Sequence, residues 1–411
     1  MRAFHLSWFA FFLAFFGWFG IAPLMAVVRE DLDLSSSQVG NTIIASVAVT
    51  AFARQLVGWC CDRFGPRLSY SGLLILGAIP VIAIGLAENY ESLLLLRLAI
   101  GVIGASFVIT QYHVSLMFSA DVVGTANATA AGWGNLGGGL AQMAVPLVLS
   151  ALIWCGIEEA LGWRLAMLLP GSALLVMGIA YYHWTQDTPF GNFGELRERQ
   201  RARPAAPGSS VLRLAAADYR VWTLFLAYAA CFGVELTINN IAALYFHDRF
   251  GLSVGVAGVV AGLFGLMNLF ARPLGGLIGD RAGIRSGLRG RALFLAGVLL
   301  LEALMLIVFS RMGALPLAIA SMIVCSLFVQ MSEGATFSIV PFVNRRALGS
   351  VAGLVGAGGN AGAVGFGFLL RGESRAVEDA LLVIALFMLC AAVLVLVVRF
   401  DRSRAATPTR E

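Results

Sequence analysis

The chain has 411 residues, of which 59% are hydrophobic and only 12% are charged. Soluble proteins carry about a quarter of charged residues, so the composition excludes a set of ordinary soluble domains and favours a protein of the lipid bilayer. The net charge is +5 and all basic residues are arginine, so a single arginine is weaker evidence for an anion site than usual.

Apolar runs of about 20 residues, the length that crosses a bilayer as a helix, recur along the whole chain. They predict twelve helices, near 4–28, 38–60, 68–87, 92–117, 122–153, 163–184, 220–247, 253–279, 289–310, 314–340, 347–370 and 376–399. We therefore expect an all-α membrane protein with two pseudo-symmetric six-helix bundles, 1–184 and 220–400. A polar cytoplasmic linker over 185–219 joins them, and a cytoplasmic tail covers 401–411.

Arginine is unevenly distributed between the two sets of connecting loops. If the first residue is cytoplasmic, the inner loops and termini hold 19 arginines and the outer loops hold five. Because positively charged loops stay in the cytoplasm, we expect a multi-pass protein of the cytoplasmic (inner) membrane with both termini inside. The four remaining arginines fall within helices: Arg54, Arg97, Arg164 and Arg272.

Two segments of the first half are repeated in the second half. The residues Arg54, Gly58, Asp62, Arg63, Gly65 and Arg67 recur 218 positions later as Arg272, Gly276, Asp280, Arg281, Gly283 and Arg285. Likewise, Gly134-Asn135-x-Gly137 in the fifth helix corresponds to Gly359-Asn360-x-Gly362 in the eleventh, and GASF at 104–107 to GATF at 334–337. Duplicated six-helix units are typical of transporters whose site lies between the repeats.

The stretch GWGNLGGG at 132–139 also satisfies the G-x-G-x-x-G pattern of dinucleotide-binding loops. Such a loop follows a β-strand and opens a helix of a soluble fold, whereas this stretch lies inside an apolar run. We interpret its glycines as small residues that let membrane helices pack closely. We expect no enzymatic activity, no cofactor and no metal ion.

The loop motif over 58–67 resembles the helix 2–3 motif of the major facilitator superfamily. The paired Gly/Asn segments, together with two intramembrane arginines, resemble the nitrate/nitrite porter family over nearly the whole chain. The resemblance implies that Arg54 and Arg272 clamp the substrate, and that Asn135, Phe107, Tyr228, Phe232 and, less firmly, Asn360 lie beside it. It also implies that the loop residues Asp62, Arg63, Asp280 and Arg281 steady one conformation without touching the substrate.

The position of Arg54 and Arg272 has its own physical argument. Each lies eight residues before a loop aspartate, which places it about 12 Å inside the helix end. Burying a guanidinium near mid-bilayer is costly, and no acid lies within a turn or two in the sequence. We expect the pair to leave the empty cavity electropositive and to bind a small planar anion with its forked donors.

The seventh helix supplies candidate wall residues, because Tyr228, Phe232 and Glu235 are spaced to share one helix face. Tyr228 could donate its hydroxyl to the anion, and Phe232 could cover the plane of the anion. The amides of Asn135 and Asn360 could donate to the substrate or to a neighbouring helix.

A proton-coupled carrier would need an additional group, because arginine does not titrate at physiological pH. The intramembrane candidates are His113, Glu235, Glu302 and Glu333, of which Glu235 is best placed. We expect proton-coupled uptake of nitrate, and of nitrite, by a monomer that binds no nucleic acid. Nitrate/nitrite exchange without protons, transport of another small anion, and a membrane nitrate sensor remain as alternatives.

Overall fold

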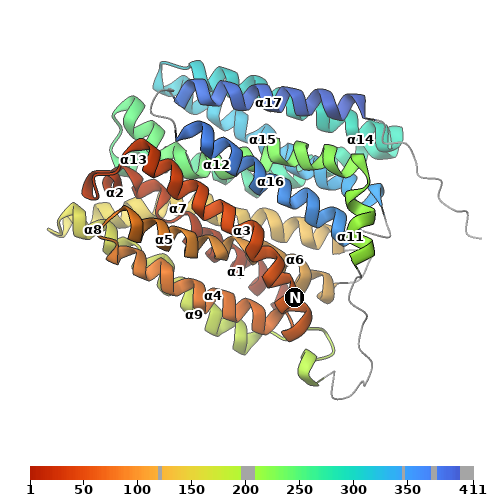
Figure 1. The fold of residues 1–411 in the computed structure, drawn as a ribbon, viewed down its shortest axis with the longest axis horizontal. Coiled ribbons are helices and arrows are strands. Elements are labelled where there is room, and N and C mark those ends of the chain that lie inside the picture. Colours follow the sequence, from red (N-terminus) through yellow and green to blue (C-terminus); the bar gives the residue numbers. More distant parts are fainter. Residues whose placement is uncertain (119–122, 196–208, 345–347, 372–376, 399–411) are drawn as a thin grey trace, which may run out of the picture.

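The computed structural model describes residues 1–118, 123–195, 209–344, 348–371 and 377–398, and these residues are almost entirely helical (Figure 1). The helices of the first half are α1 (Arg2–Phe19), η1 (Ala22–Leu24), α2 (Met25–Asp31), α3 (Ser36–Phe64), α4 (Pro66–Ala83), η2 (Ile84–Leu86), α5 (Tyr90–Gly101), η3 (Val102–Ala105), α6 (Ser106–Met117), α7 (Val123–Trp154), α8 (Glu159–Ala166) and α9 (Leu168–Trp184). Those that follow are α11 (Ser209–Ala216), α12 (Tyr219–Phe250), α13 (Val254–Leu266), η4 (Met267–Leu269), α14 (Ala271–Arg311), α15 (Leu315–Val343), α16 (Leu348–Leu370) and α17 (Val377–Val397).

The number of membrane crossings agrees with the sequence. Within the described ranges, 11 helical stretches are long and apolar enough to span a bilayer, and the longest of them, Val254–Arg311, has 58 residues. Its backbone leaves the helical conformation at Gly287, where φ is +65°. Gly290 lies against the carbonyl group of Ala282, eight residues earlier in the chain. The chain therefore reverses its direction at Gly287. This stretch therefore contains two crossings, and the described chain has the twelve that were predicted.

Local sequence signals fix several helix ends. Ser35 and Gln38 form a reciprocal capping box at the start of α3. At its other end, Gly65 has a φ of +87°, and Pro66 begins α4, since proline fits the first helical turn. The carboxylate of Asp187 lies against Gly65 and accepts a hydrogen bond from the Arg67 amide at 2.8 Å. A residue of the segment after α9 thus caps α4.

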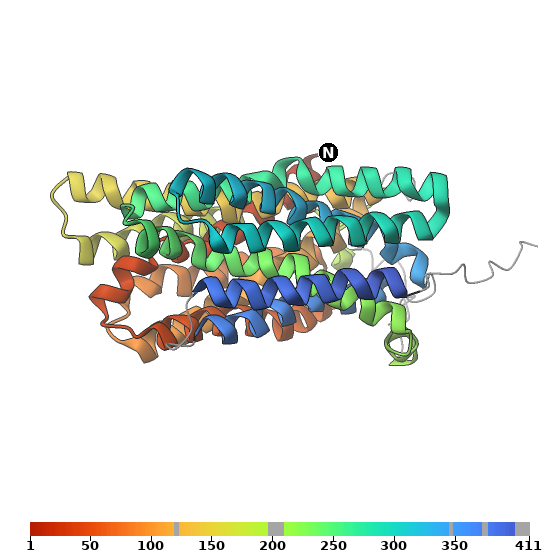
Figure 2. The same cartoon turned by 90° about the horizontal axis from the view of Figure 1, so that it is seen from above.

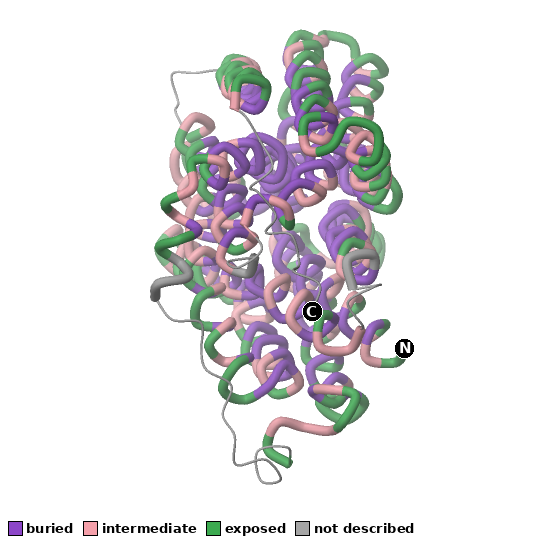
Figure 3. The backbone as a smooth tube through the Cα atoms, turned by 90° about the vertical axis from the view of Figure 1, so that its right-hand side faces the viewer, coloured by how far each residue is buried: buried purple, intermediate pink, exposed green. Residues whose placement is uncertain are grey.

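The two halves form two groups of helices aligned with the long axis of the molecule. In Figure 1, helices α1 to α9 occupy the lower part and α12 to α17 the upper part. The end of the bundle that carries residue 1 is called the Met1 face here, and the opposite end, with α2 and α8, the far face. Buried backbone gathers between the two groups, whereas exposed backbone lies at the periphery (Figure 3). The seam between the halves is therefore the protected interior of the molecule.

The halves contact each other through small residues. Helix α7 packs on α13, and α3 packs on α16. A side chain on Gly139 would meet the Gly265 backbone at 2.7 Å, and one on Gly40 would meet Arg371 at 2.4 Å. Such close approach is possible only without a Cβ atom. These glycines thus allow the two halves to pack closely between the centre of the molecule and the far face.

The segment expected to be a polar linker contains the short helix α11, which packs against α12 and α16. Ala215 of this helix is fully buried. Figure 2 shows α11 at the Met1 end of the molecule. The predicted tail over 401–411 lies outside the described residues.

Candidate functional site

A small enclosed cavity lies between the two halves and is lined by residues from six helices. They are Arg54, Phe107 and Asn135 from the first half, and Tyr228, Phe232, Arg272 and Gly356 from the second. The structure thus brings together six of the seven residues predicted to contact substrate. The seventh, Asn360, is buried but does not line the cavity, and Gly356, one helical turn earlier, takes that place. The volume of about 10 Å³ is room for about one water molecule.

Arg54 reaches the cavity from α3 and contacts the other half of the molecule. Its guanidinium donates a hydrogen bond of 3.0 Å to the Gly356 carbonyl on α16, and it lies 5.8 Å from the centre of the Phe107 ring. Among the described residues, no carboxylate lies within ion-pair distance of Arg54. The sequence expectation of an arginine without an acidic partner therefore holds here.

Arg272 reaches the same cavity from α14 in different surroundings. One of its terminal nitrogens lies 2.6 Å from a carboxylate oxygen of Glu333 on α15, and the other donates a hydrogen bond of 2.9 Å to the Tyr228 hydroxyl. The expectation that neither arginine has a carboxylate partner is thus wrong for Arg272. The sequence could not show this pair, because its members lie on different helices, 61 positions apart.

Aromatic rings form the walls of the cavity. Tyr228 and Phe232 stack on one another with ring centres 5.2 Å apart, as their spacing on one helix face predicts. The edge of Phe337 packs against Tyr228 at 5.1 Å. On the first half, Phe107 packs against Phe11 of α1 at 5.7 Å. The arginine head groups therefore lie in a largely apolar enclosure, where charge–charge interactions are strong.

Glu235 lies behind the cavity wall, fully buried, and joins the two halves. One of its oxygens accepts a hydrogen bond of 2.7 Å from the Asn268 amide in the second half. The other accepts a weak bond of 3.5 Å from the Asn135 amide on α7. The Asn135 carbonyl oxygen has no hydrogen-bond partner among the described residues, and neither polar atom of Asn360 has one. The two asparagines of the repeat thus differ in their surroundings.

The repeated glycines lie where helices pack most closely. A Cβ atom on Gly134 would meet the Phe11 ring at 1.8 Å, and one on Gly137 would meet the Phe12 carbonyl at 1.9 Å. In the second half, the equivalent atoms on Gly359 and Gly362 would meet Phe232 at 2.3 Å and the Ala229 carbonyl at 2.5 Å. The glycine segments of α7 and α16 therefore allow close packing of α1, whose Phe11 lies behind Phe107, and of α12, which carries Tyr228 and Phe232.

The charged loop residues of the repeat lie at the Met1 face, away from the cavity. Asp62 accepts a hydrogen bond of 3.0 Å from the Tyr112 hydroxyl, and the Arg63 guanidinium lies 5.7 Å from the Trp59 ring centre. Asp280 pairs with Arg291 at 2.5 Å, beyond the Gly287 turn, while Arg281 is exposed to solvent. The partner Arg291 was not singled out in the sequence, because it lies outside the repeated motif.

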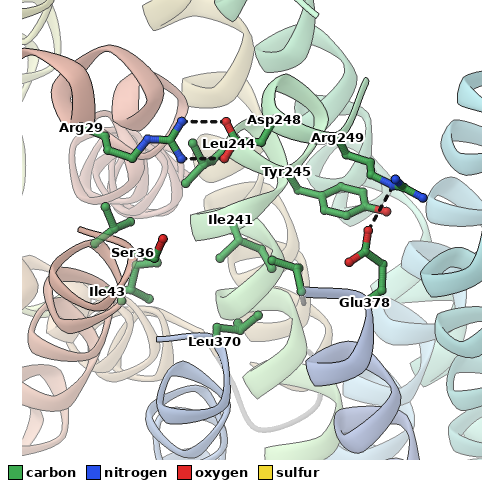
Figure 4. A pocket seen from close by; sticks show the side chains of 13 residues that line it. Arg29, Ser36, Ile43, Ile241, Leu244, Tyr245, Asp248, Arg249, Leu370 and Glu378 are labelled. Carbon is green, nitrogen blue, oxygen red and sulfur yellow. Dashed lines mark hydrogen bonds and ion pairs between the residues drawn. The ribbon is translucent and has the colours of Figure 1, made fainter. Parts of the chain in front are cut away.

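A second, larger cavity of about 280 Å³ lies between the halves at the far face (Figure 4). Arg29 of α2 forms a two-pronged ion pair with Asp248 of α12, at 2.6 and 2.8 Å, which crosses between the halves. Arg249 pairs with Glu378 of α17 at 3.1 Å, inside the second half. A charged pair therefore joins the two halves at this end of the seam.

The other proposed proton carriers have different environments. His113 lies in a network with Ser7, Tyr181 and the Gln186 carbonyl, inside the first half. Glu302 is fully buried on α14. Neither residue lines the central cavity. Of the four candidates, Glu333 alone has a described ion pair with one of the two cavity arginines.

Comparison with known proteins places the chain in a family. Residues 7–367 match the family model of the Major Facilitator Superfamily. The chain is 42% identical over 364 residues to "High affinity nitrate transporter 2.5" of Arabidopsis thaliana, covering 89% of this chain and 72% of that protein. It is 31% identical over 431 residues to "Nitrate/nitrite transporter NrtP" of Nostoc punctiforme, covering 88% and 85%.

Solved structures support the same fold. A bacterial homolog of the human lysosomal transporter Spinster, in an inward-facing and occupied conformation, superposes with a TM-score of 0.74 at 16% identity and covers 95% of each chain. The xylose transporter XylE of E. coli, in an inward-open conformation, superposes with a TM-score of 0.70 at 12% identity, covering 98% of this chain and 97% of that one. The chain belongs to the major facilitator superfamily and, within it, to the family of nitrate and nitrite transporters.

Proposed function

We propose that this protein carries nitrate, and also nitrite, across the cytoplasmic membrane by alternating access, with the anion held between Arg54 and Arg272. The observation that carries the proposal is the meeting of these two arginines, one from each half, on one enclosed cavity. The relatives at 42% and 31% identity are named as transporters of these anions. Both termini are assigned to the cytoplasm, because arginine is concentrated in the loops of the Met1 face.

The chemistry of the cavity fits a small planar anion. Each guanidinium offers parallel N–H donors that match coplanar oxygens. In the present conformation, Arg54 donates one hydrogen bond to the Gly356 carbonyl. This carbonyl is a neutral acceptor, so an anion can replace it. Phe107 and Phe232 line the cavity, and we assign their rings to covering the plane of the bound anion. Asn135 provides an amide for a third oxygen.

The site lies at the seam, so a rocking motion of one half against the other exposes it to each side in turn. The Arg29–Asp248 pair joins the halves at the far face, and we assign it to the conformation closed there. The loop residues Asp62, Arg63, Asp280 and Arg281 lie at the opposite end, and we assign them to the conformation closed at the Met1 face. A single chain holds the complete site, which is sufficient for a monomeric carrier.

Proton coupling is the proposed driving force, because acidic side chains are buried beside one of the two arginines. Glu235 and Glu333 are both fully buried, and both interact electrostatically with Arg272. Isolated intramembrane acids are costly and commonly serve transport. An exchanger of nitrate for nitrite would need no such groups, since the substrates themselves restore the charge balance.

Transport into proteoliposomes tests the proposal. Purified protein should accumulate labelled nitrate when an inward proton gradient is imposed, and unlabelled nitrite should compete for uptake. Uptake that ignores the proton gradient and requires internal nitrite would replace symport by exchange. A protein that binds nitrate without any counterflow would be a sensor, and one that counterflows only another anion would refute the substrate assignment.

A further inference from the structure

Three carboxyl groups are fully buried in the second half, and they differ in what surrounds them. Both oxygens of Glu235 accept amide hydrogen bonds, from Asn135 and Asn268. Glu302 makes no ion pair among the described residues and lies beside the Ser332 hydroxyl of α15. No donor hydrogen-bonds to Glu333 in the described part of the chain, but it lies 2.6 Å from the Arg272 guanidinium and beside the carboxyl group of Glu235. Among the described residues, the charged group that stabilises the Glu333 carboxylate is thus Arg272.

The same guanidinium is one side of the proposed anion clamp, so Glu333 and a bound anion would compete for it. Two negative charges about 4 Å apart, at an effective dielectric constant of 20, weaken binding by about a thousandfold. Arg272 cannot relieve the conflict, because arginine stays protonated. The conflict is removed if the Glu333 carboxylate takes up a proton when the anion arrives.

The groups that face Glu333 come from each helix packed on α15. Helix α14 presents Arg272 and Glu302, and α12 presents Tyr228, Cys231 and Glu235. The described residues of α13, η4 and α16 contribute no titratable side chain to this environment. A proton on Glu235 would weaken the two amide hydrogen bonds that this residue accepts, because a neutral carboxyl group is a poorer acceptor than a carboxylate. A proton on Glu333 weakens no such bond, and it removes the repulsion between the Glu333 and Glu235 carboxylates.

We propose that Glu333, through its ion pair with Arg272, is the residue that couples proton binding to anion binding in this carrier. With the site empty, the Glu333 carboxylate neutralises Arg272. A proton from the open side of the membrane adds to a carboxylate oxygen of Glu333, its ion pair breaks, and the Arg272 donors turn to the anion. Release of the anion on the other side of the membrane frees the Arg272 guanidinium, Glu333 gives up its proton to that side, and the ion pair forms again. The inference rests on the proposed nitrate transport and replaces Glu235 as the first choice for the coupling group.

The wild-type protein provides the first test. If one proton is bound with each nitrate, nitrate affinity must fall as pH rises, by up to about tenfold per pH unit. Nitrate binding can be measured in detergent between pH 5 and pH 8, and proton uptake on nitrate addition can be followed with a pH-sensitive dye. A nitrate affinity that is independent of pH over this range would overturn the inference, whatever the variants do.

The variant Glu333→Gln provides the second test, because glutamine has the shape and charge of the protonated acid. We expect it to retain nitrate binding and counterflow of labelled nitrate, with an affinity that no longer depends on pH. Uptake driven by a proton gradient should be lost. Glu302→Gln is the matched control, since it neutralises an equally buried acid that has no described arginine partner, and it should keep the pH dependence of the wild type.

The outcomes separate the inference from the proposed function. A wild type without any nitrate binding or counterflow would refute nitrate transport itself. Wild-type counterflow with normal pH dependence, together with an unchanged pH dependence and proton-driven uptake in Glu333→Gln, would refute only the role of Glu333. If Glu333→Gln fails to fold, the pH dependence of wild-type affinity still decides whether a proton accompanies the anion, and Glu235→Gln with unaltered pH dependence would leave Glu333 as the coupling group.

Discussion

The two halves of the molecule present the same residue to the cavity in different surroundings. Arg54 bonds to a backbone carbonyl of the opposite half and has no described carboxylate partner, whereas Arg272 lies against Glu333 of its own half. In the repeat that aligns 104–107 with 334–337, the residue corresponding to Glu333 is Ile103. In the proposed function, the repeated residues supply two cations for one anion. The departure from the repeat places an acid beside one arginine only, and this is the difference on which the proposed coupling to protons depends.

The largest predicted effect is the loss of an arginine. We expect Arg54→Ala and Arg272→Ala each to weaken nitrate binding at least about a hundredfold, because a charged hydrogen bond contributes about 1.5–3 kcal/mol and each arginine can make two. The two variants should differ in their free energy of unfolding. Arg272→Ala leaves Glu333 buried without its counter-charge, which lowers the free energy of unfolding by about 3–5 kcal/mol. Arg54→Ala leaves no described acid without a partner. Nitrate binding and thermal unfolding in detergent measure both effects.

The double variant Arg272→Ala/Glu333→Gln is the control for this difference. It removes the unpaired charge together with the arginine, so we expect the unfolding temperature to recover while nitrate binding stays lost. Equal destabilisation by Arg54→Ala and Arg272→Ala would contradict the asymmetry. Wild-type affinity in either single variant would refute the clamp.

The sequence predicts the fold well, because the features that determine it are local. Long apolar runs fix the crossings, and the glycine at 287 lies in a short polar stretch where the prediction already separated two helices. The repeat also predicts that Arg54 and Arg272 lie at equivalent depths. Equivalent helices of two related bundles then bring both to the seam, as observed.

The pairing of side chains across helices could not be predicted in the same way. Helix α15 is apolar all round, so its pattern does not show which face meets α14. Glu333 was therefore one of four candidates, with nothing to connect it to Arg272. Symmetry alone also misplaced Asn360, because the cavity is closed at that position by the backbone of Gly356, to which Arg54 bonds. Departures from symmetry are visible only in the assembled structure.

The next effect tests a feature that the two halves share. Gly137→Ala and Gly362→Ala each drive a methyl group into a backbone carbonyl, at 1.9 Å and 2.5 Å, and overpacking of this kind costs about 1–3 kcal/mol. We expect both variants to lower the unfolding temperature. Gly353→Ala on α16 is the matched control, because no atom lies within 4 Å of its added methyl group. An unchanged unfolding temperature in all three would show that the glycines are not packing positions.

A smaller effect should separate the two asparagines. Asn135 lines the cavity and carries an amide N–H that can donate to an anion there, whereas Asn360 lies outside the cavity lining. We expect Asn135→Ala to weaken nitrate affinity about tenfold, the value of one hydrogen bond to an anion. Asn360→Ala should change nitrate affinity less than twofold. Equal losses of nitrate affinity in both variants would mean that Asn135 and Asn360 both contact the anion, as the repeat predicts, in another conformation of the carrier.

The smallest effect concerns the place where the halves are held together at the far face. The Arg29–Asp248 pair is partly exposed, so its loss should cost no more than about 1 kcal/mol and shift the opening equilibrium by up to about fivefold. A cysteine introduced at Ile43, a buried residue that lines the far-face cavity, reports this opening in a chain freed of its native cysteines. We expect a water-soluble maleimide to label it faster in Asp248→Asn. Glu378→Gln breaks a pair confined to the second half and should leave the labelling rate unchanged. Equal rates in the two variants would mean that the ion pair between the halves does not hold the far face closed, and that the glycine contacts between the halves do so.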